Sequence, residues 1–571
     1  MQAAWRCGDS FAESRFFDRA ARRDRFSDQM PCSFLHRRIP GPAPAALACT
    51  LSRIGRINET IGNKDLFPPS GISEHSRATA CLLPQDLSAA VFLFSVFGAH
   101  PFSRPGVAGT GKDVTMNRFL SFLLGWVLLV GAPAPALASH AREPEIRALT
   151  FGFIKLTDMA PLAIALERGY FAEEGLSVTL EAQANWRILL DGVIAGTLQG
   201  AHMLAGQPLA ATIGYGPQAH IVTPLSMDLN GNGITVSNEV WQMMRPHVPS
   251  RPDGRPAHPI SAAALAPVVR AFREEGRRFD MGMVFPVSTH NYELRYWLAA
   301  GGLHPGLYAP HDASGQIGAD VFLSVTPPPQ MTAALEAGTI SGYCVGEPWN
   351  QAAVQRGIGV AVITDYQIWA DNPEKVFGLR ADFAEAYPNT TRAILRALIR
   401  AAMWLDADDN ANRRAAAEIL SRSDYVGAET EVIAASMTGT FEYEPGDMRA
   451  VPDFNVFFRG YATYPFYSDA IWYLTQMRRW GQIPQAQTDQ WYADIAASVY
   501  RPDIYSDAAR SLIRDGLARP EDFPLDSDGF RPPVTLFDGI PYDGRAPNTY
   551  IDSLPLGLTG AQRVRDEAQD G

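Results

Sequence analysis

Short apolar segments alternate with amphipathic helical segments along most of the chain, starting at residue 146. The apolar segments are typical of buried β-strands, and the links between segments are only a few residues long. This order predicts an α/β fold with a mainly parallel sheet and helices on both faces. Ligands in such folds bind beyond the carboxyl ends of the strands. The first predicted strands are 146–154, 176–180, 200–204 and 219–225, with helices at 161–169, 185–195 and 207–214.

A turn-rich segment interrupts the alternation at 228–233, where the sequence reads DLNGNG. Its Asn-Gly steps give flexible turns, so we expect the chain to cross here into a second lobe. The alternation then resumes, and a second crossing is expected near Glu347. Two lobes joined by two crossings predict a hinge that closes on a ligand. The expected parts are lobe I at 139–228, lobe II at 229–346, a return to lobe I with a helical extension at 347–519, and a Pro/Gly-rich tail at 520–571.

The first 115 residues differ from the rest of the chain in composition. They hold four of the five cysteines and many scattered arginines and prolines, and they show no sustained periodicity. Residues 116–138 follow the plan of a secretory signal peptide, with an apolar run at 119–130 and the small-residue site ALA at the end. We therefore expect Met116 to be the true start, the residues before it to be a non-native, disordered extension, and the mature protein to be periplasmic.

Charge and cysteine content exclude several classes of function. The formal net charge of -12 disfavours a nucleic-acid partner, which usually needs a basic face. Only Cys344 follows the signal peptide, so that part of the chain has no intrachain disulfide and no cysteine-based metal site. No cofactor and no metal ion are expected. An anionic ligand would have to be held by local donors, because the overall charge repels it.

One stretch, residues 284–302, has the pattern of a ligand seat. A short apolar strand leads to Ser288, Thr289 and His290, and an amphipathic helix follows and stops at a Gly-Gly pair. A helix start carries unpaired N–H groups and the positive end of the helix dipole, which suit a small anion. The alternative is that a hydroxyl caps the helix and His290 is an ordinary surface residue.

Seven stretches between about residues 146 and 482 together resemble the nitrate/bicarbonate-binding family of ABC-transporter periplasmic proteins. They read LTFGFIKLTDMAPLAIALERGYFAEEGL, GAHMLAGQPLAAT, MDLNGNGITVSN, THNYELRYWLAAGG, YCVGEPWN, IWADNPEKVFGL and YPFYSDAIWYLTQMRRWG. The resemblance implies a two-lobed periplasmic binding protein without enzymatic activity, which delivers a small anion to an ABC permease and its ATPase. We expect a monomer.

The resemblance also implies roles for residues of these stretches. Trp186 would form a wall of the anion site, or else pack a helix start. Asn232 would present its amide to the anion, or else serve as a hinge-turn residue. Thr289 and His290 fall on the helix start that contacts the anion, which favours a ligand role for His290.

Other matching positions are assigned to the cleft edge and the hinge. Thr157 and Asp158 would line the cleft mouth or cap a helix, and Glu347 is expected to be a hinge or structural residue rather than a ligand. In the resembled family, a residue before the IW pair is basic for nitrate and acidic, with a metal ion, for bicarbonate. Tyr366 or Gln367 occupies that place here, and both are neutral. The expected ligand is therefore nitrate or nitrite first, bicarbonate (with or without calcium) second and a small organic anion third.

Two rival functions use a similar fold. A nitrate sensor that regulates a cytoplasmic partner is disfavoured by the export segment that begins at Met116. An enzyme similar to pyrimidine synthases would carry a Cys-rich active segment, whereas the exported part holds only Cys344. No triphosphate loop, G-x-S-x-G elbow or H-E-x-x-H site is present.

Overall fold

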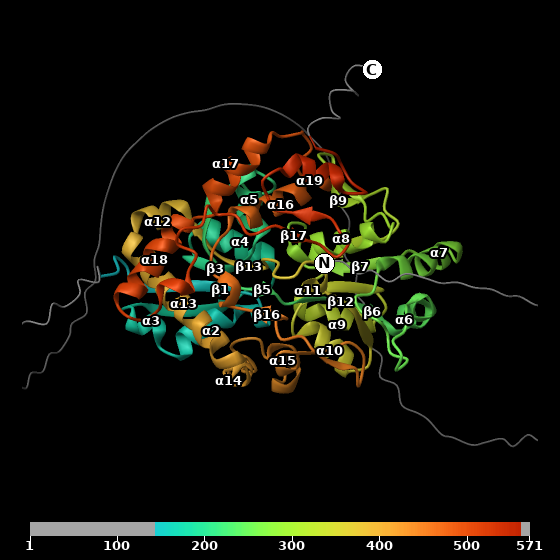
Figure 1. Ribbon diagram of the computed structural model, residues 1–571, viewed down its shortest axis with the longest axis horizontal. Helices are drawn as coiled ribbons and strands as arrows, with labels where there is room; N and C mark the ends of the chain where they lie inside the picture. The colour runs from blue at the N-terminus through green and yellow to red at the C-terminus, as the bar shows by residue number, and fades with distance from the viewer. Residues whose placement is uncertain (1–142, 561–571) are drawn as a thin grey trace, which may run out of the picture. The chain divides into compact units, whose positions relative to one another are not determined.

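The computed structural model describes residues 143–560, which contain two five-stranded sheets (Figure 1). The first sheet has the order β2-β1-β3-β13-β4 and the second β10-β7-β11-β6-β12. The first is built from β1 (Ala148–Phe153), β2 (Ser177–Ala182), β3 (Gly200–Leu204), β4 (Ile221–Ser226) and β13 (Lys375–Arg380). The second is built from β6 (Asn232–Ser237), β7 (Asp280–Met283), β10 (Phe322–Val325), β11 (Gly342–Gly346) and β12 (Gly359–Thr364).

Each sheet contains one strand that runs against the other four. In the first sheet β13 is antiparallel to β3 and β4, and in the second β6 is antiparallel to β11 and β12. The chain reaches each of these two strands directly after leaving the other sheet. Each strand therefore begins at the edge of its sheet where the parallel strands end. The two-lobed, mainly parallel α/β fold predicted from the sequence is thus confirmed, with one antiparallel strand in each sheet.

The chain passes between the sheets twice. The first passage, after β4, runs through β5 (Leu229–Asn230), which pairs with β16 (Asn455–Val456). The second runs from α11 (Asp365–Ile368) to β13. The return placed near Glu347 from the sequence is wrong, because β12 still belongs to the second sheet. In Figure 1 β5 and α11 lie between the two groups of strands.

Helices surround both sheets. Those up to the second passage are α2 (Ala160–Glu167), α3 (Tyr170–Glu173), α4 (Trp186–Ala195), α5 (Gly206–Ile213), α6 (Asn238–Met244), α7 (Ala266–Glu274), α8 (Thr289–Ala300), α9 (Met331–Glu336) and α10 (Trp349–Gln355). The later ones are α12 (Ala381–Ala386), α13 (Pro388–Asn410), α14 (Arg413–Leu420), α15 (Thr430–Met437), α16 (Tyr467–Arg479), α17 (Asp489–Val499), α18 (Pro502–Arg514) and α19 (Pro547–Ser553). Small two-stranded sheets are formed by β8 (Leu307–Ala309) with β9 (Asp312–Ile317), β14 (Thr440–Glu442) with β15 (Met448–Ala450), and β17 (Val534–Thr535) with β18 (Pro541–Tyr542).

The two lobes are packed against each other. One hydrophobic core runs through both sheets and includes Leu204 of the first and Met283 of the second. Gly206, at the start of α5, lies so close to the second lobe that a Cβ atom there would fall 2.1 Å from the Val287 carbonyl oxygen. A side chain at this position would force the lobes apart, so the structure represents a closed arrangement.

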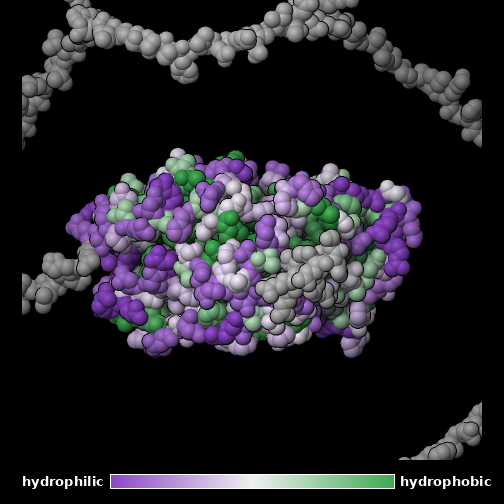
Figure 2. All heavy atoms as spheres, turned by 90° about the horizontal axis from the view of Figure 1, so that it is seen from above, coloured by the Kyte–Doolittle hydropathy of each residue, from purple (hydrophilic) through white to green (hydrophobic). Residues whose placement is uncertain are grey.

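The C-terminal part of the described chain packs against the two lobes and does not form a separate domain. The segment after residue 520 buries Leu536, Tyr542 and Tyr550 against the helices. Figure 2 shows a largely hydrophilic face with small hydrophobic areas, in line with the few exposed large apolar residues. None of the helices within 143–560 is both long and apolar enough to cross a membrane. The predicted upstream extension and signal peptide lie outside the described residues.

Candidate functional site

Polar side chains gather between the two sheets, at the edge where the parallel strands end. Asn232 is the first residue of β6 and Lys375 is the first residue of β13, so the two antiparallel strands begin there. The segments that follow β1, β7 and β12 reach the same edge and supply Asp158, His290 and Asp365. All five residues are buried, with at most 4% of their surface exposed.

Lys375 is the centre of this cluster. Its ammonium lies 2.6 Å from Asp158 Oδ2 and also contacts the Glu374 carboxylate. Trp186, at the start of α4, places its ring 5.8 Å from the same ammonium, and no group among residues 143–560 accepts a hydrogen bond from its indole N–H. Burial raises the pKa of Asp158, but Lys375 and His202 outweigh it and hold this pKa below its usual value. The Asp158 carboxyl therefore favours its charged form beside Lys375.

His290 lies at the start of α8 without a hydrogen bond. Within the described chain neither ring nitrogen has a hydrogen-bond partner, although Nδ1 lies 3.3 Å from Glu374 Oε1. The side chain is fully buried, and burial together with Lys375 holds its pKa well below the usual value. An unpartnered buried imidazole is costly unless a ligand completes its hydrogen bonds.

His202, on β3, is a contrasting histidine in the same cluster. Its Nδ1 accepts the backbone N–H of Ile154 at 3.4 Å, and its Nε2 lies 2.8 Å from Asp158 Oδ1. Both nitrogens are therefore engaged by the protein, which fixes a neutral ring with hydrogen on Nε2. His202 shapes the site but has no group to spare for a ligand.

Asn232 is held by carboxylates. Its Nδ2 donates to Glu374 Oε1 at 2.8 Å and to Glu293 Oε2 at 3.2 Å, and its backbone N–H donates to Asp365 Oδ2 at 3.0 Å. Both amide hydrogens are thus taken, and Oδ1 has no donor within the described residues. Asn232 presents an acceptor oxygen, whereas the sequence-based expectation was an amide that donates to the anion.

Three buried carboxyl groups have raised pKa values: Asp365 of the cluster, and Glu293 and Asp228 beside it. Burial, followed by the neighbouring Asp365, raises the pKa of Glu293 well above its usual value. Burial also raises the pKa of Asp365 to about 7, against the backbone N–H groups that lower it. The pKa of Asp228 is raised well above normal by burial and then by Asp158. These groups favour their neutral forms, so they add less negative charge than their number suggests.

The threonines expected at the site serve the protein itself. Thr289 Oγ1 lies 2.8 Å from the hydroxyl of Tyr473. Ser288, not Thr289, caps α8 by accepting the Asn291 N–H at 3.0 Å. Thr157 donates from its backbone N–H to the Glu347 carbonyl at 2.8 Å, so it joins the two lobes.

The neutral position before Trp369 is not part of the cluster. Gln367 Oε1 accepts the Thr364 N–H at 3.1 Å and so caps α11. Tyr366 reaches the cluster only through its backbone, whose N–H donates to Asp365 Oδ1 at 2.8 Å. No hydrogen bond or ion pair within residues 143–560 joins the Tyr366 or Gln367 side chain to the cluster. Lys375, which was not among the residues expected at the site, is buried in the cluster instead. A lysine opening an apolar strand was the signal that could have revealed it.

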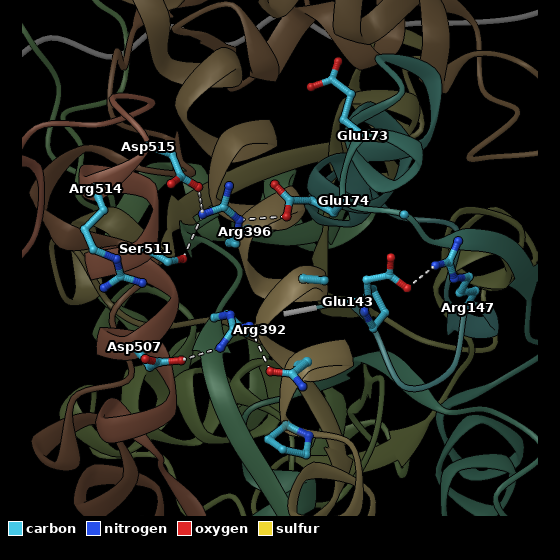
Figure 3. A pocket seen from close by; sticks show the side chains of 15 residues that line it. Glu143, Arg147, Glu173, Glu174, Arg392, Arg396, Asp507, Ser511, Arg514 and Asp515 are labelled. Atoms are coloured by element: carbon cyan, nitrogen blue, oxygen red, sulfur yellow. Dashed lines mark hydrogen bonds and ion pairs between the residues drawn. The ribbon is translucent and has the colours of Figure 1, made fainter. Parts of the chain in front are cut away.

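A surface pocket offers a second possible anion site. It lies among α3, α13 and α18, encloses about 610 Å³ and is lined by several arginines (Figure 3). Arg396 pairs there with Glu174 at 2.7 Å and Asp515 at 2.9 Å, and Arg392 pairs with Asp507 at 3.5 Å. Its central arginines are thus neutralised by carboxylates, so this pocket is a weaker anion site than the buried cluster.

No metal centre is apparent in the part of the chain that the structure describes. The buried carboxylates and histidines do not form a group of three or more His, Cys, Asp or Glu residues with metal-holding geometry. What the cluster can do is hydrogen-bond a small, planar, negatively charged molecule. Lys375, His290 and Trp186 supply the donors.

Comparison with known proteins identifies relatives. Residues 142–421 match the NMT1-like family. The nitrate/nitrite binding protein NrtA of Nostoc is 32% identical over 434 residues, which cover 74% of this chain and 90% of that protein. The crystal structure of the periplasmic nitrate-binding protein NrtA from Synechocystis superposes with a TM-score of 0.61 at 31% identity, covering 72% of this chain and 100% of that one.

Longer proteins are similar over the same region. The nitrate import ATP-binding protein NrtC of Synechocystis is 36% identical over 414 residues, and the bicarbonate transport ATP-binding protein CmpC of Synechococcus elongatus is 34% identical over 411 residues. Each match covers 72% of this chain but only 55% of the relative. The chain therefore spans about half the length of these two relatives.

Proposed function

Because the chain belongs to the NMT1-like family and is homologous to solute-binding proteins of ABC transporters rather than to enzymes, we propose that it captures nitrate or nitrite between its lobes. It would act in the periplasm and deliver the anion to a membrane permease driven by an ATPase. The observation that carries the proposal is the buried ammonium of Lys375 beside His290 and the indole of Trp186, two groups that have no hydrogen-bond partner within residues 143–560.

The chemistry of the cluster suits a monovalent oxyanion. Nitrate offers three acceptor oxygens and no hydrogen, so each contact must come from a protein donor. A charge-assisted hydrogen bond from Lys375 contributes roughly 1.5–3 kcal/mol, more than a neutral one. The positive end of α8, which begins at Thr289, adds to the attraction.

Bicarbonate is the second candidate, and Asn232 favours it. Its Oδ1 is a buried acceptor without a donor in the described chain. The hydroxyl of bicarbonate could donate to it, whereas nitrate leaves it unpaired, at a cost of about 1–3 kcal/mol. A relative named as a bicarbonate transport protein is consistent with this alternative.

Calorimetric titration of the protein from residue 139 onward tests the proposal. Nitrate, nitrite and bicarbonate are added separately, the last with and without calcium. We expect saturable binding of nitrate or nitrite at micromolar concentrations. Tighter binding of bicarbonate than of nitrate would support the second candidate instead.

Replacing His290 with alanine is expected to weaken nitrate binding about tenfold or more, the loss of one good hydrogen bond. The matched control is His220→Ala, since His220 is exposed and its ring bonds the Ser498 carbonyl at 3.0 Å, away from the cluster. Titration of both variants measures the difference. An unchanged dissociation constant for His290→Ala would remove this residue from the site.

A further inference from the structure

Glu374 is an unexpected group in an anion site. It is fully buried, and its two oxygens contact three of the side chains that surround the proposed ligand. Oε1 accepts from Asn232 at 2.8 Å and lies 3.3 Å from His290 Nδ1, while the other oxygen contacts the ammonium of Lys375. A carboxylate here repels an incoming anion unless it also prepares a group that attracts one.

The two nitrogens of His290 impose opposite demands on a neutral ring. If Nδ1 carries the single hydrogen and gives it to Glu374, Nε2 has only a lone pair and repels an oxyanion. If Nε2 carries the hydrogen, the lone pair of Nδ1 faces the Glu374 oxygen 3.3 Å away. Only an imidazolium, with hydrogen on both nitrogens, satisfies the carboxylate and the anion together.

The charged groups around His290 determine whether its ring binds a second proton. His290 faces Glu374 and Lys375 at the start of β13, Asp158 after β1, and His202 on β3. Glu293 lies on the same helix, and Asp365 borders the cluster from α11. Burial and Lys375 favour the neutral ring while no anion is present. A bound anion reverses this balance, because it cancels the charge of Lys375 and adds a negative neighbour.

We infer that Glu374 is a positioning residue that makes His290 take up one proton when the anion binds. The proton comes from solvent and bonds to the free ring nitrogen, and no other bond forms or breaks. Nδ1–H then donates to Glu374 and Nε2–H donates to an oxygen of the anion. This inference rests on the proposed capture of nitrate or nitrite.

Proton uptake can be counted without any variant. Nitrate is titrated calorimetrically into the full exported protein in buffers that differ in ionisation enthalpy, and the slope of the observed enthalpy gives the protons taken up. We expect close to one proton per nitrate in the pH range where the free ring is neutral. Since binding takes up a proton, affinity must fall as pH rises, by up to about tenfold per pH unit.

Glu374→Gln tests the role of the carboxylate. Glutamine keeps the size of the side chain and an oxygen for Asn232, but it cannot stabilise an imidazolium as a charged partner does. We expect this variant to bind nitrate with little proton uptake and a flatter pH profile. Glu347→Gln is the matched control, since Glu347 is also a buried carboxyl at the lobe junction and should leave the uptake unchanged.

Nitrogen-15 NMR of the imidazoles gives an independent readout. With nitrate bound, both nitrogens of His290 should carry hydrogen, while His202 stays neutral in the same spectrum and serves as the reference. Nitrate binding without proton uptake, or a neutral His290 in the complex, would overturn this inference and leave the proposed function standing. Absence of binding of nitrate, nitrite and bicarbonate in every buffer would overturn both.

Discussion

Replacing Lys375 with methionine is expected to weaken nitrate binding by at least about a hundredfold. Among residues 143–560, Lys375 is the only lysine in the cluster, and it lies 2.6 Å from Asp158 and in contact with Glu374. Its loss removes a charge-assisted contact to the anion. It also leaves two buried carboxylates without a counter-charge, and both then repel the ligand.

The expected size follows from adding these two effects. The lost hydrogen bond alone accounts for roughly 1.5–3 kcal/mol, or about ten- to a hundredfold in affinity. The unmasked carboxylates increase the loss, since breaking a buried ion pair on one side costs about 3–5 kcal/mol. Part of that second cost falls on the stability of the protein, so circular dichroism at the titration temperature must show that the variant is folded.

The chain supplies a matched control for this variant. Residues 143–560 contain only two lysines, and the other one, Lys155, donates to the Ser423 carbonyl at an exposed position. Lys155→Met should bind nitrate as the unmodified protein does. A dissociation constant for Lys375→Met within about threefold of the unmodified value would contradict the proposed role of the lysine.

The local sequence pattern was enough to predict the fold class but not the full path of the chain. Alternating strands and helices, and the glycine-rich turn at 228–233, correctly indicated two α/β lobes. The return passage was expected near Glu347, but the helix and strand that follow this residue could belong to either lobe. Periodicity reports that a strand is buried but not which sheet it joins. That choice depends on long-range pairing, here of β12 with β6.

The candidate site, like the fold, could be predicted only in part from the sequence. Trp186, Asn232, His290 and Asp158 were named from sequence stretches far apart in the chain, and the structure brings them into one buried cluster with Lys375. Lys375 was missed because the side chain of a lysine is usually exposed to solvent. Its burial results from the antiparallel entry of β13, which begins at the site, and that is a property of the topology.

The orientation of Asn232 could not be predicted either. A sequence identifies an amide but not which end of it faces a ligand. Glu293 and Glu374 take both amide hydrogens, and these residues come from a helix and from the second passage between the lobes. Three segments had to meet before the acceptor oxygen could be assigned to the site.

Replacing Glu347 with glutamine is expected to remove a large pH-dependent loss of stability. Glu347 is 1% exposed and follows β11, and burial raises its pKa to about 8 from 4.5. The folded protein therefore favours the neutral carboxyl. Its contribution to stability is fully present below pH 4.5 and is lost as pH rises to about 8. A shift of this size corresponds to roughly 4–5 kcal/mol across that window.

Glutamine resembles the neutral carboxyl at every pH. The free energy of unfolding of Glu347→Gln should therefore exceed that of the unmodified protein by nearly nothing at pH 4–5 and by about 4 kcal/mol above pH 8. Urea denaturation of both proteins in half-unit pH steps measures this difference. Glu336→Gln is the control, because Glu336 is half exposed and pairs with Arg356 on the surface. Asp158 acts in the opposite direction, since its lowered pKa makes its contribution present above its unfolded value of 3.8 and lost only at lower pH. The effects of Glu347 and Asp158 on stability therefore fall in different pH ranges. If the difference in free energy of unfolding between Glu347→Gln and the unmodified protein stayed constant from pH 5 to 9, the Glu347 carboxyl would already be ionised in the folded protein.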